Sequence, residues 1–298
     1  MPHAAGQAVP VTLSDGASLH LRRAGRPDGP RLFLSHGNGF AIDGYRDFWE
    51  PLAERFELVL FDMRNHGQSQ PAGGDGHHYR QLARDLESVA AAAGAAFGEK
   101  PGIGVFHSMS ARAALKQAVE GPRLWAALAL YDPPSVPPPA HPLHAAMRAF
   151  EIRLVSFALD RPERFASPDA LEAQFATGRA QARWTARSRA EMARAILRPD
   201  GAEWTLRCPR ELEAAIYLQA LTLDLWPKAA QAPLPVKIIG ADPDLEGTGP
   251  TGRANAALAA EGGFPYEAVS GTGHLLQIER PEACRAALVG WLEGLGLA

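Results

Sequence analysis

Short runs of apolar residues recur along the chain, and helical segments separate most of them. The runs are continuous, as in strands that are buried on both faces of a sheet: RLFLS (31–35), LVLF (58–61), GIGVF (102–106), LALY (128–131), VKIIG (236–240) and YEAV (266–269). This succession predicts an α/β fold in which helices cover a mostly parallel, doubly wound sheet. Two alternating runs flank Asp15-Gly16 in VPVTLSDGASLHLRR and predict an antiparallel pair at the start of the sheet.

The succession of strands stops for about a hundred residues after Asp132, a length that suits a separate inserted unit. This stretch opens with DPPSVPPPAHP, and proline continues neither a helix nor a central strand. The remainder has helical periodicity. We therefore expect a helical cap over residues 133–232, inserted into a core formed by residues 1–132 and 233–298. A chain of 298 residues with 46% hydrophobic content is long enough for both.

Charge and composition exclude several kinds of partner. A formal net charge of -3 provides no excess of positive field for nucleic acid. The first residues lack a basic stretch followed by an apolar run, and no later run approaches the roughly 20 apolar residues of a membrane helix. We therefore expect a soluble, cytoplasmic protein that binds neither nucleic acid nor membrane. Cys208 and Cys284 are too few for a disulfide framework or a CxxC metal site, and the oligomeric state stays open.

Ser108 stands directly after a predicted strand, in GVFHSMSA (104–111). The pattern approaches G-x-S-x-G, the sharp turn between a strand and a helix that presents a nucleophilic serine. Phe106 and Ser110 occupy the two glycine positions. Ser110 is small enough for this turn, whereas Phe106 requires either a slightly opened turn or space left for its ring by a neighbouring element.

Three further segments follow predicted strands. In SHGNGF (35–40), Gly37 and Gly39 allow a sharp turn that exposes backbone N–H groups. FDMRNHGQS (61–69) suits a tightly hydrogen-bonded loop, and GTGHLLQIERPE (271–282) contains His274. Together with the Ser108 segment, these stretches resemble the α/β-hydrolase superfamily over about residues 10–132 and 233–296. In that family a nucleophile, an acid and a histidine follow one another in this order along the chain.

The resemblance implies a catalytic triad with Ser108 as nucleophile and His274 as base. A serine hydroxyl needs an imidazole to take its proton, and an aspartate then holds the imidazole. Asp242 is favoured as the acid because Pro243 would make the following turn rigid, and Asp244 stays open. Asp132 is the least favoured, since Asp-Pro at the end of a strand is an ordinary turn.

The resemblance also implies an oxyanion hole. Its donors would be the backbone N–H groups of Met109, directly after the nucleophile, and of Asn38. Gly37, Phe40 and His107 adjoin these segments and are candidates for contacts with the substrate. No cofactor and no metal are expected.

A serine nucleophile predicts acyl transfer, because a serine alkylated by an epoxide or a halide would remain as a stable ether. The expected activity is hydrolysis of a carboxylic ester, thioester or lactone, with a small acyl compound as substrate and an acyl-serine intermediate. Two alternatives stay open. The same triad could hydrolyse a carbon–carbon bond of a diketone, or the chain could be a non-catalytic ligand-binding protein on the same scaffold, an option that Phe106 supports.

Overall fold

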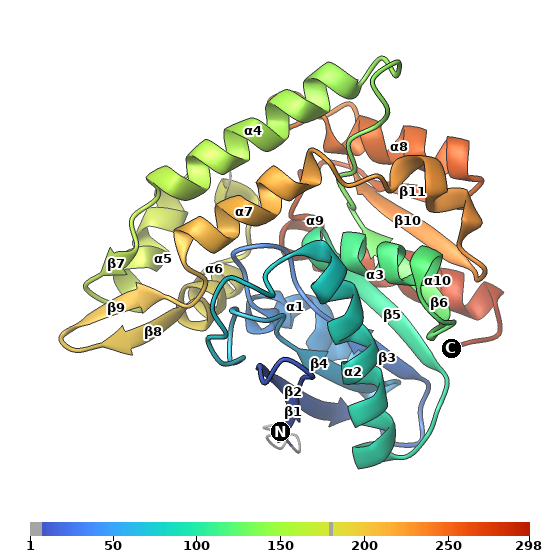
Figure 1. The fold of residues 1–298 in the computed structure, drawn as a ribbon, viewed down its shortest axis with the longest axis horizontal. Coiled ribbons are helices and arrows are strands. Elements are labelled where there is room, and N and C mark those ends of the chain that lie inside the picture. The colour runs from blue at the N-terminus through green and yellow to red at the C-terminus, as the bar shows by residue number, and fades with distance from the viewer. Residues whose placement is uncertain (1–7, 179–180) are drawn as a thin grey trace.

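The computed structural model describes residues 8–178 and 181–298, and Figure 1 shows a twisted sheet with helices on both sides. Within these residues eight strands form the main sheet in the order β1-β2-β4-β3-β5-β6-β10-β11. The strands are β1 (Ala8–Thr12), β2 (Ser18–Gly25), β3 (Arg31–Leu34), β4 (Glu57–Phe61), β5 (Gly102–His107), β6 (Trp125–Tyr131), β10 (Val236–Ala241) and β11 (Tyr266–Val269). Each apolar run predicted to be a strand overlaps one of them, and the predicted fold class is confirmed.

The pairing of the strands brings several loops to one edge of the sheet. β1 and β2 are antiparallel across Asp15-Gly16, as predicted, and β2 is also antiparallel to β4. All the other neighbouring pairs of this sheet are parallel. Because the carboxyl ends of parallel strands point the same way, the loops after β3, β5, β6, β10 and β11 converge at one edge, where ligands bind in open α/β sheets.

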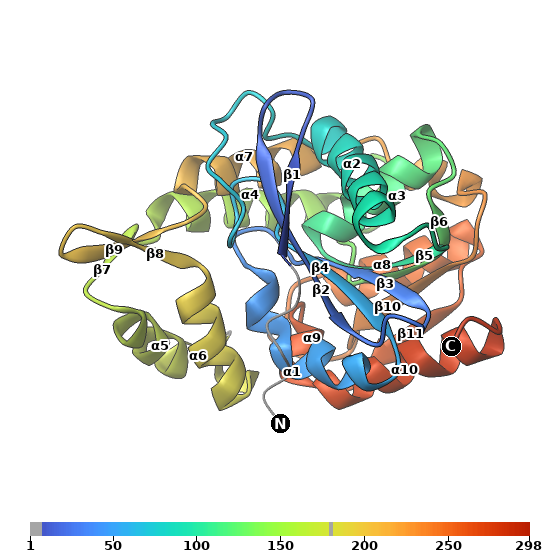
Figure 2. The same cartoon turned by 90° about the horizontal axis from the view of Figure 1, so that it is seen from below.

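Two apolar cores lie on opposite faces of the sheet, and successive strand residues alternate between them. Leu32 and Leu34 belong to one core, and Phe33 between them belongs to the other. Figure 2 shows α2, α3 and α8 on one side of the sheet, with α1, α9 and α10 on the other. These helices are α1 (Arg46–Trp49), α2 (Tyr79–Phe97), α3 (Met109–Glu120), α8 (Thr251–Gly262), α9 (Leu276–Glu279) and α10 (Pro281–Gly294). Burial on both faces explains the continuous apolar runs.

The chain between β6 and β10 forms the unit that we propose as the cap. It contains α4 (His144–Asp160), β7 (Arg164–Phe165), α5 (Pro168–Thr177), α6 (Ala186–Ala195), β8 (Leu197–Asp200), β9 (Glu203–Leu206) and α7 (Arg210–Ala220). The four helices lie where helical periodicity predicted them. The expectation of a purely helical insertion is wrong, however, because β7, β9 and β8 form a small antiparallel sheet. Short 3-10 turns complete the chain at 42–45, 50–54, 181–183 and 226–231.

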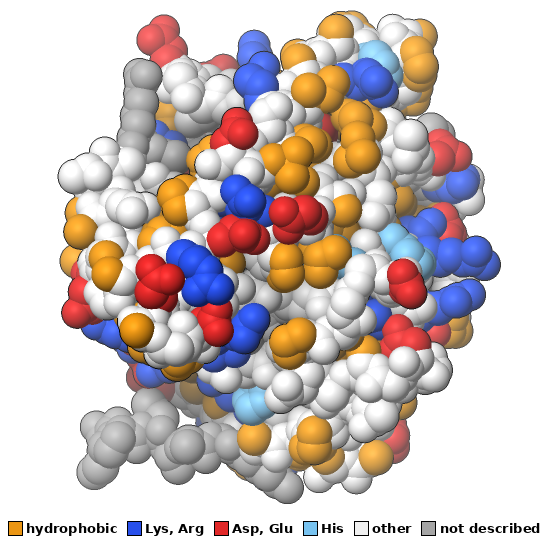
Figure 3. Space-filling model, turned by 60° about the vertical axis from the view of Figure 1, so that its left-hand side comes forward, with side chains coloured by type: hydrophobic (Ala, Val, Ile, Leu, Met, Phe, Trp, Pro, Cys, Tyr) orange, Lys and Arg blue, Asp and Glu red, His pale blue; other side chains and the backbone are white. Residues whose placement is uncertain are grey.

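The outer surface of this unit carries several exposed hydrophobic side chains: Ile152, Phe157 and Leu159 on α4 and Leu218 on α7. Figure 3 shows the side of the molecule that lies on the left in Figure 1, where hydrophobic side chains are mixed with acidic and basic ones. Among the described helices, none is long and apolar enough to cross a membrane. Cys208 and Cys284 are both buried free thiols.

Candidate active site

Ser108 occupies the sharp turn between β5 and α3. Its backbone has φ 52° and ψ -111°, a conformation that is costly for a residue with a side chain. Two hydrogen bonds hold this turn: the N–H of Ser108 donates to the carbonyl of Tyr131 (3.0 Å), and its carbonyl accepts from the N–H of Arg112 (2.9 Å). The strand and the helix together thus hold this serine in a strained backbone conformation.

The ring of Phe106 fits beside this turn without opening it. It is fully buried and packs edge-to-face against Trp125, with the ring centroids 5.4 Å apart. Gly104 leaves the space, since a Cβ at that position would lie 2.5 Å from Cε2 of Phe106. On the helix side, the hydroxyl of Ser110 donates to the carbonyl of His107 (3.0 Å). Of the two options for Phe106, the space left by a neighbour is therefore the one realised.

His274 and Asp132 complete a line of hydrogen-bonded side chains with Ser108. Nε2 of His274 lies 2.9 Å from Oγ of Ser108, and Nδ1 lies 2.6 Å from Oδ2 of Asp132. His274 comes from the loop after β11, and Asp132 directly follows β6. A hydroxyl, an imidazole and a carboxylate in this order allow proton transfer from the hydroxyl to a histidine whose tautomer is fixed.

The carboxylate of Asp132 is fully buried and fixed by further donors. Its Oδ1 accepts from the N–H of Ala241 (2.9 Å) and from Nδ2 of Asn255 (2.7 Å). Burial raises the pKa of Asp132, but the hydrogen bond and charge of His274, together with hydrogen bonds from Ala241 and Thr251, lower it by more, so that the pKa lies below its ordinary value. This carboxyl is therefore ionised at neutral pH.

The structure corrects the sequence prediction of the acid, because neither Asp242 nor Asp244 is the partner of His274. Oδ2 of Asp242 accepts the N–H of Gly271 (2.8 Å) and its Oδ1 accepts the N–H of Asp244 (2.9 Å). Asp242 thus shapes the loop that leads to His274, and Asp244 is exposed. The strand order explains the difference, since β6 lies next to β5, the strand that ends at the serine.

The loop after β3 presents one free backbone donor near Ser108. The N–H of Gly37 donates to the hydroxyl of Tyr45 (3.2 Å), and the N–H of Gly39 donates to Nε2 of His66 (3.0 Å). Between them, the N–H of Asn38 has no acceptor among the described residues. A Cβ at Gly37 would lie 3.3 Å from Cβ of Ser108, so this loop directly adjoins the turn.

Met109 supplies a second backbone donor at the same place. It is the first residue of α3, and the N–H groups of a first helical turn have no acceptor within the helix. Ser108, the residue before the helix, does not cap it with its side chain. Asn38 and Met109 therefore both present free N–H groups around Ser108, and their role as oxyanion donors stays a prediction.

Two buried histidines hold the loop that contains Asn38. Nε2 of His36 accepts the N–H of Met63 (3.1 Å), and its Nδ1 donates to the carbonyl of Gly37 (2.8 Å). Burial lowers the pKa of His36 to about 4 and that of His66 to about 3. Both rings are therefore neutral near pH 7 and serve as fixed acceptors.

His107 does not have the role expected from the sequence. Its ring is buried, with Nδ1 2.8 Å from the hydroxyl of Tyr45 and Nε2 2.9 Å from the carbonyl of His274. Both ring nitrogens are occupied, so neither is available to a substrate. The ring instead supports the backbone of His274, a contact that the strand pattern alone does not reveal.

The proposed cap contacts the loop after β3 at two residues, Asn38 and Phe40. Phe40 packs edge-to-face on Trp184, with the ring centroids 5.9 Å apart. Nδ2 of Asn38 donates to the backbone carbonyl of Glu213 on α7 (2.8 Å), and the carboxylate of Glu213 pairs with Arg161 (2.7 Å). Burial raises the pKa of Glu213 even though the Arg161 guanidinium lowers it. Phe40 thus lies at the boundary between the loop and the cap.

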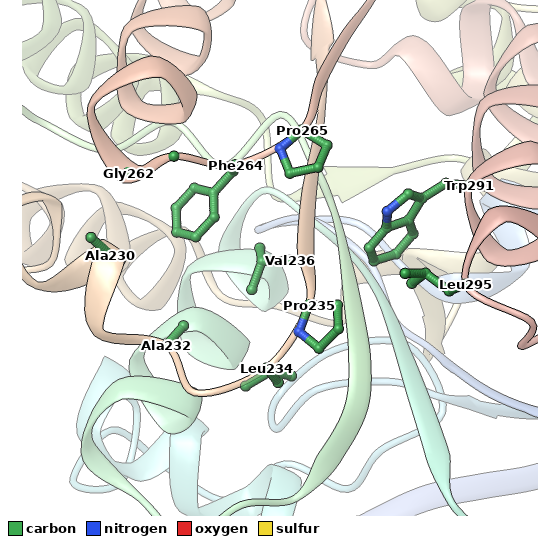
Figure 4. Close-up of a pocket in the computed structure, with 11 residues that line it drawn as sticks. Ala230, Ala232, Leu234, Pro235, Val236, Gly262, Phe264, Pro265, Trp291 and Leu295 are labelled. Carbon is green, nitrogen blue, oxygen red and sulfur yellow. The ribbon is translucent and has the colours of Figure 1, made fainter.

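A cavity of about 310 Å³ lies elsewhere, at the amino end of β10 (Figure 4). The side chains that line it are apolar and include Leu234, Pro235, Val236, Phe264 and Trp291. Ser108 and His274 lie at the opposite, carboxyl edge of the sheet. This cavity therefore takes no part in the arrangement around the serine.

Comparison with known proteins agrees with the fold. The family model described as the alpha/beta hydrolase family matches residues 32–287. The chain is similar to a solved E-2-(acetamidomethylene)succinate hydrolase, with a TM-score of 0.80 and 20% identity over 97% of this chain and 99% of the other. It is also similar to a thioesterase domain from the curacin biosynthetic pathway, with a TM-score of 0.73 and 16% identity over 96% and 99% of the two chains.

A third similar structure is a thermophilic esterase from Thermogutta terrifontis, with a TM-score of 0.69 and 18% identity over 97% of this chain and 98% of the other. Among curated protein sequences, none matches significantly. Identities this low indicate a shared fold and leave the substrate to be argued from the site.

Proposed function

The chain belongs to the alpha/beta hydrolase family, and from this premise we propose that it is a serine hydrolase that cleaves a carboxylic ester, thioester or lactone. The observation that carries the proposal is the 2.9 Å approach of Nε2 of His274 to Oγ of Ser108, with Asp132 behind the ring. A serine in this position forms an ester with an acyl group, which water can later hydrolyse.

The first half of the proposed reaction uses His274 as a base. Oγ of Ser108 attacks the carbonyl carbon of the substrate while Nε2 of His274 takes the hydroxyl proton. Asp132 accepts the hydrogen bond from Nδ1 and stabilises the imidazolium that forms. The tetrahedral oxyanion is bound by the N–H groups of Asn38 and Met109, whose fixed position costs no reorganisation during the step.

In the second half of the proposed reaction, His274 acts first as an acid and then again as a base. His274 gives its proton to the leaving alcohol or thiol as the bond from the carbonyl carbon breaks, and the acyl group remains on Ser108. Water then attacks the acyl carbon while Nε2 takes a proton from it, and the acid product leaves with the serine hydroxyl restored. The imidazolium of His274 gives this proton to Oγ of Ser108 as the bond between Oγ and the acyl carbon breaks, so that one water molecule is consumed in each cycle.

Two of the similar structures are named as an esterase and a thioesterase, which is compatible with this reaction class. The similar structure with a TM-score of 0.80 is named as a hydrolase of an acetamido compound. Compounds with an amide-like acyl group should therefore also be tested as substrates. The expected substrate is a small acyl compound, and the proposed place of action is the cytoplasm.

The direct test is labelling with a fluorophosphonate probe, which reacts with activated serines. We expect the wild-type protein to be labelled at Ser108 and Ser108→Ala to be unlabelled, with p-nitrophenyl acyl esters hydrolysed only by the wild type. Unlabelled wild-type protein, tested beside a labelled reference hydrolase, would indicate a non-catalytic binding protein. Labelling together with cleavage of diketones but not of esters would indicate the carbon–carbon reaction.

A further inference from the structure

Glu279, the last residue of α9, is a buried carboxylate that contacts the loop carrying His274. Only 3% of its side chain is exposed. Its Oε2 accepts a hydrogen bond from the N–H of Gly273, the residue directly before His274, at 2.7 Å. The same oxygen accepts a hydrogen bond from Nε of Arg183, in the 3-10 turn at 181–183, at 2.8 Å. One carboxylate of the core therefore joins the backbone beside the proposed base to the proposed cap.

The guanidinium of Arg183 lies directly against this loop. A Cβ at Gly273 would lie 2.6 Å from Nη2 of Arg183, so the arginine occupies the space that a side chain at position 273 would need. Among the described residues, Arg183 is the only cation that pairs with Glu279. A carboxylate removed from water needs a paired opposite charge. The cap thus supplies the positive charge that compensates Glu279 in its buried position.

Other contacts of the same loop come from the core. Oδ2 of Asp242 accepts the N–H of Gly271 (2.8 Å), and Nε2 of His107 lies 2.9 Å from the carbonyl of His274. Of these bonds, the one made to Gly273 is the one whose acceptor is paired with the cap. The backbone on the amino side of His274 is therefore held by a group whose charge balance depends on the cap.

We propose that Arg183 is a positioning residue that acts through Glu279 on His274, an inference that rests on the proposed function. The two contacts fix the backbone before His274 and thereby the 2.9 Å approach of its Nε2 to Oγ of Ser108. Without the guanidinium, the buried carboxylate has no paired cation, and its bond to Gly273 weakens. A displacement of about 1 Å can lower a rate by about 10²-fold, so the cap controls the chemical step.

The kinetic test removes this guanidinium and compares the effect with the loss of another arginine of the cap. Arg183→Met should lower kcat for p-nitrophenyl acetate by about tenfold to 10²-fold with little change in KM, because His274 acts in both halves of the reaction. Arg187→Met is the matched control. Arg187 pairs with Glu50 (2.6 Å) and Asp47 (3.3 Å), a contact between cap and core that includes no residue of the His274 loop. Equal values of kcat in the two variants would overturn the proposal.

Two further variants distinguish positioning from general support of the fold, with urea denaturation to show that each protein is folded. Arg183→Lys should restore most of kcat, since the bond is made by Nε, which lies one bond nearer the backbone than Nζ of lysine. Glu279→Gln removes the buried charge but keeps an oxygen for the N–H of Gly273. In that background Arg183→Met should therefore cost much less, and losses that combine independently would contradict coupling through Glu279.

A spectroscopic measurement separates this inference from the proposed function, because it needs no turnover. The proton between Nδ1 of His274 and Asp132 should give a low-field resonance in proton NMR that is absent in His274→Gln. This resonance should shift or broaden in Arg183→Met but not in Arg187→Met. A protein that labels with fluorophosphonate but keeps kcat and the resonance in Arg183→Met would retain the proposed function and lose the positioning role. A protein that does not label, yet shows the selective shift, would lose the proposed function alone.

Discussion

Gly104 and Phe106 lie two residues apart on the same face of β5, and the ring of Phe106 occupies the space that a side chain at position 104 would need. Because a Cβ at Gly104 would come within 2.5 Å of Cε2 of Phe106, Gly104→Ala should overpack this face and lower the free energy of unfolding by about 1–3 kcal/mol. Urea denaturation measures the loss. The double variant with Phe106→Leu should lose less than the two single variants together, and strictly additive losses would speak against this contact.

Asp132→Asn should lower kcat by about 10⁴-fold, as expected when a triad acid loses its charge. The amide can still accept the bonds made by Ala241 and Asn255, so the fold should persist. Asp242→Asn is the matched control and should change kcat by less than about tenfold, since it only shapes a loop. Steady-state hydrolysis of a p-nitrophenyl ester measures both. A larger effect at Asp242 than at Asp132 would contradict the assignment.

Gly39→Ala should disturb the proposed oxyanion hole. Its φ of 74° disfavours any side chain, and a Cβ there would lie 2.6 Å from Oε1 of Glu213, so the loop with Asn38 must shift. Loss of one oxyanion donor lowers kcat by about 10²-fold to 10³-fold, and we expect a fall in that range. Gly73→Ala is the control, because φ is 69° but no atom lies within 4 Å of its Cβ. Equal kinetic effects of the two would refute a specific role for the loop.

Stability should decrease in mild acid because several buried histidines resist protonation. Burial lowers the pKa of His36 to about 4 and lowers those of three others to about 3, namely His66, His77 and His107. In the unfolded chain these rings take up protons near pH 6.5, so the folded state loses stability as the pH falls from there towards 4. At pH 5 each ring contributes a loss of about 2 kcal/mol.

Several carboxyls act in the opposite direction, since burial raises the pKa values of Asp85, Glu151 and Glu213 as well as that of Asp62. Burial raises the pKa of Asp62 to about 6, so the folded protein binds this proton before the unfolded chain does and gains stability as the pH falls through 6. We expect the four histidines to outweigh these carboxyls between pH 7 and 5. Urea titrations between pH 7 and 5 measure the balance, and His66→Gln should reduce the slope by up to one proton. A free energy of unfolding that stays constant over this range would disprove the account.

The strands and the turn at the serine could be predicted from the sequence, for identifiable reasons. Burial on both faces requires continuous apolar runs, and Asp15-Gly16 is a strong hairpin signal. The fit of Phe106 was also readable, because residues two apart in a strand share a face and Gly104 stands two positions earlier.

The identity of the acid could not be predicted in the same way. It depends on β6 lying between β5 and β10, and the order of strands in space does not follow their order in the chain. It also depends on a φ of 41° at Asp132, which the dipeptide Asp-Pro does not signal. The small sheet of the insertion was missed because LRPD contains a proline, which argues against a strand, and EWTL alternates over only four residues.

The hydrogen bond from the side chain of Asn38 to the carbonyl of Glu213 ties the core to α7 of the insertion. The same residue presents its backbone N–H beside Ser108, so the position of that donor depends on a helix from another part of the chain. The two units are therefore not interchangeable modules. A chimera that carries the insertion of a relative keeps the geometry around the serine only if its helix offers Asn38 an acceptor at the same place.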